Sequence, residues 1–266
     1  SIRYPGLSNY ENLTLTETNN FPIKHEGDVH SGKVRSVYWL SGENSYRLRN
    51  KRRYDISERS PIGVMVISDR LSAFECNWKG EDGLNGVPGK GAALNAISGY
   101  CFGQLNMEGL AGNHLLESPH PLVWIVRKAE SIKIEAIARH FLTGSMLRDY
   151  ERGQRNFGEM MLPDGLQPHQ RLPYLLVTPS TKGIMRGIPG VPEEDDVNIT
   201  KQQIIDNYEV FGFQSKEDVI FYERWLRRGF SSVGRILDPL RKIFVDTKAE
   251  FGYVMDDERL RMIYID

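Results

Sequence analysis

Charged and uncharged residues alternate along residues 246–252, DTKAEFG. Successive side chains of a β-strand point to opposite faces, so a strand here would place Asp246, Lys248 and Glu250 on one face and the intervening residues toward a core. Carboxylates and an ammonium group on one surface suit the binding of Mg²⁺ and of phosphate oxygens. Edge strands also carry alternating charges for solubility, and the segment by itself is compatible with both interpretations.

The first part of the chain predicts a small antiparallel sheet. Strands are expected at residues 33–40 and 62–68, and the charged stretch 46–54 is expected to form a hairpin region. A helix is expected from residue 92 to about residue 105, because apolar and small residues recur there at helical spacing. The residues at that spacing are Leu94, Ile97, Ser98, Cys101 and Leu105.

Two strands and two helices are expected in the middle of the chain. Residues 122–127 form an apolar run, and residues 132–141 alternate so that Ile132, Ile134, Ala136 and Ala138 share one face. Thr200 with Gln203, and Ser215 with Asp218, have the spacing of capping boxes and predict two helix starts. The apolar stripe of the second helix is Val219, Tyr222, Trp225, Leu226, Phe230 and Val233.

The end of the chain predicts short strands. Residues 243–245 are expected to form one strand, and residues 260–266 are expected to form another beside DTKAEFG. The pattern as a whole indicates the α+β class, with a small β-rich lobe at residues 1–128 and a larger α+β lobe at residues 129–266. The polar N-terminal segment extends the first lobe. Ligand sites commonly form in clefts between lobes.

The composition of the chain argues against several classes of function and indicates a cellular compartment. A formal net charge of -1 over 266 residues argues against non-specific binding of nucleic acid or of an anionic membrane. Cys76 and Cys101 have neither metal-ligand spacing nor the density of a disulfide scaffold, which indicates a reducing compartment. The opening residues lack the pattern of a signal peptide, and no apolar run approaches a membrane span, so a cytoplasmic protein is expected. The six histidines show no paired spacing that would predict zinc.

Two motifs in the first lobe carry polar chemistry. In SGKVRSVY, residues 31–38, a glycine beside Lys33 and Arg35 at a strand start could cover a phosphate group, or the segment could be an exposed hairpin edge. In SDRLSAFE, residues 68–75, Asp69 and Arg70 follow an apolar strand, where active-site residues often lie. A salt-bridged turn is the alternative.

Two motifs in the second lobe suit the binding of anions. EAIARHFLTGS, residues 135–145, combines Arg139 and Ser145 with a turn into a helix, and a helix start with a hydroxyl and a nearby arginine can hold a monophosphate. The alternative is that the hydroxyl groups only cap the helix. TPSTK, residues 178–182, offers hydroxyl groups and Lys182 to a carboxylate or phosphate, or is a plain turn.

Taken in order, these motifs resemble those of the SAICAR synthetase family of purine biosynthesis. The resemblance extends from Gly32 to Asp266 and rests on GKVRSVY, SDRLSAFE, GKGAALNAIS, EAIARHFLTGS, TPSTK, DDVNIT and DTKAEFG. It implies an ATP-grasp-like architecture with a kinase-like N-terminal lobe. It also implies an ATP-dependent ligase that joins carboxyaminoimidazole ribotide (CAIR) to L-aspartate through an acyl phosphate. The products would be SAICAR, ADP and phosphate.

The resemblance also implies roles for individual residues. The ATP contacts would be Lys33, Arg35, Lys128, Ala129, Glu135 and Lys248, and the Mg²⁺ ligands would be Glu250 and Asp266. The substrate contacts would be Arg139 and Ser145 on the 5′-phosphate, Lys90 and Lys182 on a carboxylate, and Asp69. The catalytic set would be Lys248 with Asp246 and Asp196, the two aspartates contacting the imidazole or sugar side of the ribotide.

Two features depart from the family pattern. The family continues past the aspartate of its last strand with a PDSSR-like segment whose arginine helps bind the substrate phosphate, whereas the sequence given stops at Asp266. Residues 183–195 replace a shorter link that commonly bears a histidine. Asp195 falls at the position of that histidine, which argues against a proton-transfer role there.

Two other functions stay open. A kinase-like phosphotransferase would share the glycine-led loop but would need an HRD-type catalytic segment, which this sequence lacks. A nucleotide-binding relative without catalysis would be favoured only if the family's C-terminal tail is missing. The sequence does not decide whether the chain forms a homo-oligomer.

Overall fold

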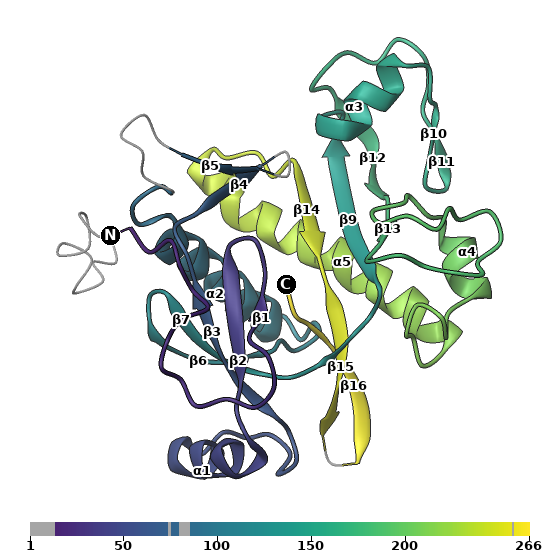
Figure 1. Cartoon of the computed structure of the whole chain (residues 1–266). Coiled ribbons are helices and arrows are strands. Elements are labelled where there is room, and N and C mark those ends of the chain that lie inside the picture. The colour runs from purple at the N-terminus through teal and green to yellow at the C-terminus, as the bar shows by residue number, and fades with distance from the viewer. Residues whose placement is uncertain (1–13, 74–75, 80–85, 257) are drawn as a thin grey trace. The chain divides into compact units, whose positions relative to one another are not determined.

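The computed structural model describes residues 14–73, 76–79, 86–256 and 258–266 (Figure 1). It divides into two compact units. Unit 1 consists of Ser1–Gly103, His114–Ala129 and Val254–Arg261, and unit 2 consists of Gln104–Asn113, Glu130–Tyr253 and Met262–Asp266. The helices are α1 (Gly42–Arg52), α2 (Lys90–Met107), α3 (Gly144–Glu151), α4 (Lys201–Asp206), α5 (Lys216–Leu237) and the 3₁₀ turn η2 (Asp238–Leu240).

Unit 1 is built on a five-stranded antiparallel sheet with the order β1-β2-β3-β7-β6. Its strands are β1 (His30–Ser31), β2 (Arg35–Trp39), β3 (Ile62–Ile67), β6 (Leu115–His120) and β7 (Val123–Arg127), and β4 (Leu71–Ala73) pairs separately with β5 (Cys76–Trp78). The buried β3 follows from the continuous apolar run IGVMVI, because a strand covered on both faces needs apolar residues at every position. The predicted strands at 62–68 and 122–127 are therefore confirmed to within one residue.

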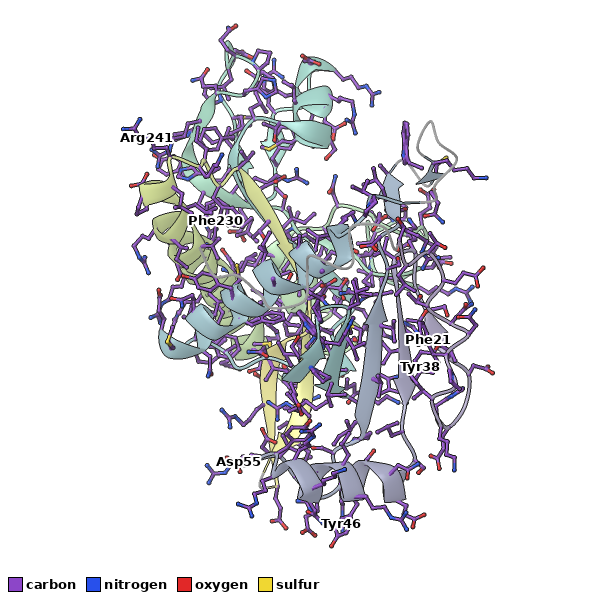
Figure 2. The ribbon with its side chains drawn as sticks, turned by 90° about the vertical axis from the view of Figure 1, so that its left-hand side faces the viewer. Phe21, Tyr38, Tyr46, Asp55, Phe230 and Arg241 are labelled. Atoms are coloured by element: carbon purple, nitrogen blue, oxygen red, sulfur yellow. The ribbon has the colours of Figure 1, made fainter. Side chains whose placement is uncertain are left out.

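The N-terminal segment from residue 14 is tied to one face of this sheet. The hydroxyl of Tyr38 donates to the Thr18 carbonyl at 2.7 Å and accepts the Phe21 amide at 3.0 Å, and Figure 2 shows the labelled Phe21 and Tyr38 side by side. The Leu15 amide donates to the carboxylate of Asp69. These contacts order the described part of the segment.

The expected hairpin at residues 46–54 is wrong, because α1 occupies this stretch. Ser41 caps the helix by accepting the Asn44 amide at 3.2 Å, and no glycine or proline interrupts residues 43–53. Glu43 and Arg47 form an ion pair one helical turn apart. The charge that indicated an exposed hairpin instead coats an exposed helix, which ends at Arg53 in the left-handed conformation.

The predicted helix near residue 92 is confirmed and is longer, but its buried face differs from the expected one. Leu94 and Ile97 are 46% and 60% exposed, whereas Asn95 and Phe102 are buried together with the expected Leu105. The Asn95 amide group reaches the inside because it donates to the Pro121 carbonyl at 2.9 Å. Apolar residues lie on every side of α2, so apolar spacing alone did not identify the packed face.

Unit 2 is organised around β9 (Ile134–Phe141), which pairs antiparallel with β12 (Arg171–Val177), β13 (Ser180–Thr181) and β14 (Asp246–Ala249). Ile134, Ala136 and Ala138 of β9 are completely buried, as the alternation predicted. Further strands are β8 (Glu130–Ser131), β10 (Asn156–Phe157), β11 (Met160–Met161), β15 (Phe251–Asp256) and β16 (Arg259–Tyr264), with β16-β15-β8 forming a sheet.

Helix α5 follows most of the predicted stripe. Val219, Tyr222, Leu226 and Phe230 are buried, whereas Trp225 and Val233 are half-buried. Both predicted helix starts are confirmed, with Thr200 accepting the Gln203 amide and Ser215 accepting the Asp218 amide. Phe230, labelled in Figure 2, packs on Phe244 with ring centroids 4.6 Å apart.

One expectation for the end of the chain needs correction, because residues 243–245 do not form a strand and β14 begins at Asp246. The predicted last strand is confirmed as β16, at residues 259–264. It lies beside the end of DTKAEFG, since it pairs with β15 and Glu250 exchanges backbone hydrogen bonds with Ile265 and Asp266. DTKAEFG is thus two strands that meet at Glu250.

Candidate functional site

The pairing of β9 with β14 brings four predicted site residues together. Asp246 lies directly opposite Arg139, and its carboxylate is 3.5 Å from a guanidinium nitrogen. Two residues further along β14, the Lys248 ammonium is 2.5 Å from the Glu135 carboxylate. Ala249 points into the core, so the charged residues of β14 do share a face. These four residues, Glu135, Arg139, Asp246 and Lys248, form a charged row along β9 and β14. In it, each basic group faces an acidic group on the neighbouring strand.

Glu250 lies at the break between β14 and β15. Its carboxylate pairs with the ammonium of Lys182, which follows β13. Its amide donates to the Asp266 carbonyl at 3.1 Å, and its carbonyl accepts the Ile265 amide at 2.9 Å. The two predicted metal ligands, Glu250 and Asp266, are consequently adjacent in the structure although they are far apart in the sequence. Lys182 is the cation placed beside them.

Both residues predicted to bind a phosphate, Arg139 and Ser145, line a cavity of about 190 Å³. The Nε of Arg139 donates to the Thr178 hydroxyl at 3.1 Å. Burial lowers the pKa of the Arg139 guanidinium, and the charges of Asp246 and Asp149 oppose that effect. The lining residues are Arg139, Ser145, Met146, Asp149, Gln154, Asn156, Phe157, Gly158, Thr178, Pro179, Asn198, Ile199 and Thr200.

Ser145 is the second residue of α3. The preceding N-cap residue, Thr143, makes no side-chain capping bond, and Gly144 has a φ of +60°, a conformation that glycine adopts without strain. The start of α3 is therefore not closed by the Thr143 hydroxyl. A helix N-terminus beside the half-buried Arg139 favours an anionic ligand in this cavity.

Asp196 lies where residues 195–199 run beside residues 179–183. The Asp195 carboxylate accepts the Gly183 amide at 2.7 Å and the Asp196 amide at 2.9 Å. Asp196 itself has a φ of +56°, which is uncommon for a residue other than glycine. Asp195 thus closes the loop that separates Lys182 from Asp196. Sequence reasoning missed this role, although aspartate is a residue type whose side chain commonly bonds to backbone groups in turns and loops.

The residues predicted to contact ATP in unit 1 lie in two places. Lys33 and Arg35 belong to the β1–β2 hairpin, whose turn is closed by the Gly32 amide donating to the Arg35 carbonyl at 2.8 Å. Lys128 lines a cavity of about 510 Å³ together with Trp39, and its ammonium is 5.3 Å from the Trp39 ring centroid. The Lys128 amide donates to the Pro61 carbonyl, so this predicted backbone donor is already bonded within the unit.

Asp69 and Lys90 have contacts of a structural kind. The buried Asp69 carboxylate accepts the amides of Leu15 at 3.0 Å and of Gly91 at 2.8 Å, which joins the N-terminal segment to the start of α2. The Lys90 ammonium donates to the Arg70 carbonyl at 2.9 Å. These contacts give Asp69 a structural role, and its predicted contact with the substrate stays a prediction.

The predicted residues thus fall into two groups. Unit 1 holds Lys33, Arg35, Asp69, Lys90, Lys128 and Ala129, and unit 2 holds Glu135, Arg139, Ser145, Lys182, Asp196, Asp246, Lys248, Glu250 and Asp266. Within the described ranges, no cluster of three or more histidine, cysteine or acidic residues forms a metal site. No helix in the described part of the chain has the length and apolar character needed to cross a membrane.

A cavity lined by Arg139, beside carboxylates paired with lysines, defines a protein that binds a small ligand with phosphate or carboxylate groups. Comparison with known proteins defines the class further. The profile of the family described as SAICAR synthetase matches residues 28–265. The chain belongs to the SAICAR synthetase family.

Individual relatives agree with this assignment. The phosphoribosylaminoimidazole-succinocarboxamide synthase of Vibrio parahaemolyticus is 55% identical over 256 residues, which cover 96% of this chain and 70% of that protein. A SAICAR synthase from Saccharomyces cerevisiae in complex with SAICAR has a TM-score of 0.66 at 22% identity, covering 95% of this chain and 76% of that one. A SAICAR synthetase in complex with ADP has a TM-score of 0.61 at 18% identity, and the match covers 90% of this chain and 79% of that one. The two structures share the fold.

Proposed function

We propose that the chain catalyses the ATP-dependent joining of CAIR to L-aspartate, which gives SAICAR, ADP and phosphate. The observation that carries the proposal is the cavity that holds Arg139 and Ser145 next to the charged row of β14, in a chain with relatives of this activity at 55% identity. The relatives of known structure that carry SAICAR and ADP support the same substrates. A phosphotransferase or a non-catalytic relative is not favoured.

The chemistry accounts for the residue types. A carboxylate does not accept an amine until one of its oxygens becomes a leaving group. In the proposed sequence, the CAIR carboxylate attacks the γ-phosphorus of ATP and releases ADP. The aspartate amine then attacks the acyl carbon, loses a proton, and displaces phosphate. Phosphoryl transfer depends on positioning and on neutralising charge more than on a protein nucleophile, which is why lysines, arginines and acids make up the site.

Within unit 2, we assign the ribotide phosphate to Arg139 and Ser145, which share the cavity. Lys248 is assigned to the phosphate groups of ATP, with Glu135 holding its ammonium and also contacting the nucleotide. Asp246 and Asp196 are assigned to the imidazole or sugar side of the ribotide. Lys182 is assigned to a substrate carboxylate.

The residues around Glu250 fit a magnesium site. Mg²⁺ is usually held by one or two carboxylates together with water and phosphate oxygens, and Glu250 is adjacent to Asp266. The ion pair between the Lys182 ammonium and the Glu250 carboxylate supports the binding of a cation at this position. Bound there, Mg²⁺ would neutralise charge on the transferred phosphoryl group. Glu250 and Asp266 would hold it, and Lys182 would be released toward a carboxylate.

We further propose that unit 1 is the kinase-like part of a two-lobed ATP-grasp-like architecture. Its five-stranded antiparallel sheet, the glycine-led β1–β2 hairpin and the helix α2 support this. Lys33 and Arg35 are assigned to the ATP phosphates. The cavity beside Trp39 supports a base subsite near Lys128. Because the Lys128 amide is already bonded to Pro61, the base would contact the Lys128 carbonyl or the Ala129 amide.

The substrate-binding role predicted for Lys90 remains a proposal, with its ammonium now held by the Arg70 carbonyl. A cytoplasmic location is also proposed. The two free cysteines, Cys76 and Cys101, support it, since thiols persist in a reducing compartment.

A coupled assay for ADP release tests the proposed function. The unmutated protein is expected to release ADP only when CAIR and L-aspartate are both present, and Glu250→Ala is expected to abolish that release. Mg²⁺ binding to the ADP complex, measured by titration calorimetry, should weaken at least about tenfold in the same variant, because one of two carboxylate ligands is lost. ADP release by the unmutated protein without both substrates, or no release with them, would overturn the assignment.

A further inference from the structure

We propose that Thr178 is a positioning residue that orients the guanidinium of Arg139 toward the phosphate of the ribotide, an inference that rests on the proposed function. Its hydroxyl accepts the Nε hydrogen of Arg139 at 3.1 Å. Thr178 lines the same cavity as Arg139 and Ser145 and is only 9% exposed. The side chain acts through Arg139 rather than on the reacting atoms.

The sheet holds both partners in place. Arg139 lies on β9, between Leu176 of β12 on one side and Asp246 of β14 on the other. Thr178 follows β12 directly, and its amide donates to the Ile137 carbonyl at 2.8 Å. The Thr178 backbone is therefore fixed against the same strand that carries Arg139. A hydroxyl anchored in this way can define the direction of a neighbouring side chain.

The effect on phosphate binding depends on which guanidinium nitrogen of Arg139 Thr178 contacts. A guanidinium binds phosphate best through two parallel N–H donors, and its orientation matters as much as its charge. The bond to Nε leaves the terminal nitrogens as the pair that can face a ligand. On the Asp246 side, the 3.5 Å separation is an ion pair too long for a strong hydrogen bond. Thr178 is thus the neighbour that sets the plane of the guanidinium.

Burial raises the importance of this orientation. The Arg139 side chain is 14% exposed, so few water molecules can compensate for a misaligned donor. A buried charged group that is incompletely bonded carries a large desolvation cost. Without the Thr178 hydroxyl, Arg139 would keep its charge beside Asp246 but lose its fixed plane. Phosphate affinity should fall while the catalytic row of β14 stays intact.

The test compares Thr178→Val, Thr178→Ser and Thr18→Val. Valine keeps the branched shape of threonine but removes the acceptor, whereas serine retains it. Thr18→Val is the matched control, because Thr18 is a buried threonine of unit 1 whose hydroxyl bonds Ser36 at 2.8 Å. Thermal unfolding of each variant reports any general loss of stability.

For Thr178→Val, the KM for CAIR should rise about 10- to 100-fold, the range of a lost bond to a charged group. Its kcat and its KM for ATP should stay within about twofold, and Thr178→Ser should restore the KM for CAIR to within about threefold. Thr18→Val should leave all three unchanged. An unchanged KM for CAIR in Thr178→Val, an equal rise in both KM values, or failure of serine to rescue would each overturn the proposal.

Direct binding separates this proposal from the proposed function. Ribose 5-phosphate, titrated by calorimetry without ATP, should bind the unmutated protein and Thr178→Ser, and should bind Thr178→Val at least about tenfold more weakly. If the unmutated protein shows no ligase turnover but this binding pattern holds, the proposed function fails and the role of Thr178 stands. Equal binding by all variants, or no binding by the unmutated protein, would refute the role of Thr178.

Discussion

Asp246 and Arg139 lie directly opposite each other on β14 and β9, with a carboxylate oxygen of Asp246 3.5 Å from a guanidinium nitrogen of Arg139. The pair connects two motifs that the sequence separates widely, DTKAEFG and EAIARHFLTGS. Because β9 is paired on both sides, the position of Arg139 is determined by the sheet rather than by a loop. A site carried on paired strands keeps its geometry better than one carried on mobile segments.

Arg139→Lys tests the need for a planar guanidinium. Lysine keeps the positive charge but cannot donate to Thr178 through Nε while presenting two parallel donors to a phosphate. The KM for CAIR should rise by about 100-fold, with a smaller change in the KM for ATP. Steady-state kinetics with each substrate varied measure this. Arg47→Lys, on the exposed surface of α1, is the control and should behave as the unmutated protein.

Lys248→Met tests the contribution of the Lys248 ammonium to phosphoryl transfer from ATP. Removing the ammonium should lower kcat/KM for ATP at least about 100-fold, because the lost charge faces the developing charge of phosphoryl transfer. Glu135→Gln keeps a hydrogen-bond acceptor for Lys248 and should lower kcat/KM for ATP less, by about tenfold. Equal losses in the two variants would contradict the larger effect assigned to the Lys248 charge.

Substitutions of Asp195 distinguish a structural role of its carboxylate from a role in proton transfer. Its carboxylate accepts two backbone amides at the ends of the loop between Lys182 and Asp196. Asp195→Asn retains an oxygen acceptor and should keep activity within about threefold, whereas Asp195→Ala should lose about tenfold. A proton-transfer role would instead make the asparagine variant as inactive as the alanine variant, so the ratio of the two kcat values decides.

The lowered pKa of Glu223 predicts how the free energy of unfolding depends on pH. Burial alone would raise the pKa of Glu223, but hydrogen bonds from Lys201 at 2.8 Å and from Arg227 at 2.6 Å outweigh it and lower the pKa. A lowered pKa in the folded state contributes stability above the unfolded value of about 4.3 and loses it as the pH falls through the folded value.

At pH 7, Glu223→Gln should therefore reduce the free energy of unfolding by about 1–3 kcal/mol. Urea unfolding at pH 7 and below pH 4 measures the difference between the two proteins, which should shrink in acid as the carboxylate of the unmutated protein becomes protonated. Glu43→Gln, in the exposed pair of α1, is the control and should change the free energy of unfolding by less than about 1 kcal/mol at either pH. A difference that stays constant with pH would contradict the role of the Glu223 charge.

The sequence by itself determined the elements that depend on local periodicity. The alternation of residues 132–141 predicted the buried face of β9, and the capping boxes at Thr200 and Ser215 predicted the starts of α4 and α5. These signals are readable because each depends on side chains only two to four residues apart. The ordered series of motifs likewise indicated the family, which the comparison with known proteins then showed.

Only the tertiary structure decided which distant residues meet. The hydroxyl of Thr178 reaches Arg139, and Glu250 is adjacent to Asp266, because the strands that carry them are paired in a particular register. It also decided that α1 is a helix and that α2 buries Asn95 rather than Leu94. The physical reason is that strand register and helix packing are set by contacts over the whole fold, which local patterns of charge and hydrophobicity do not specify.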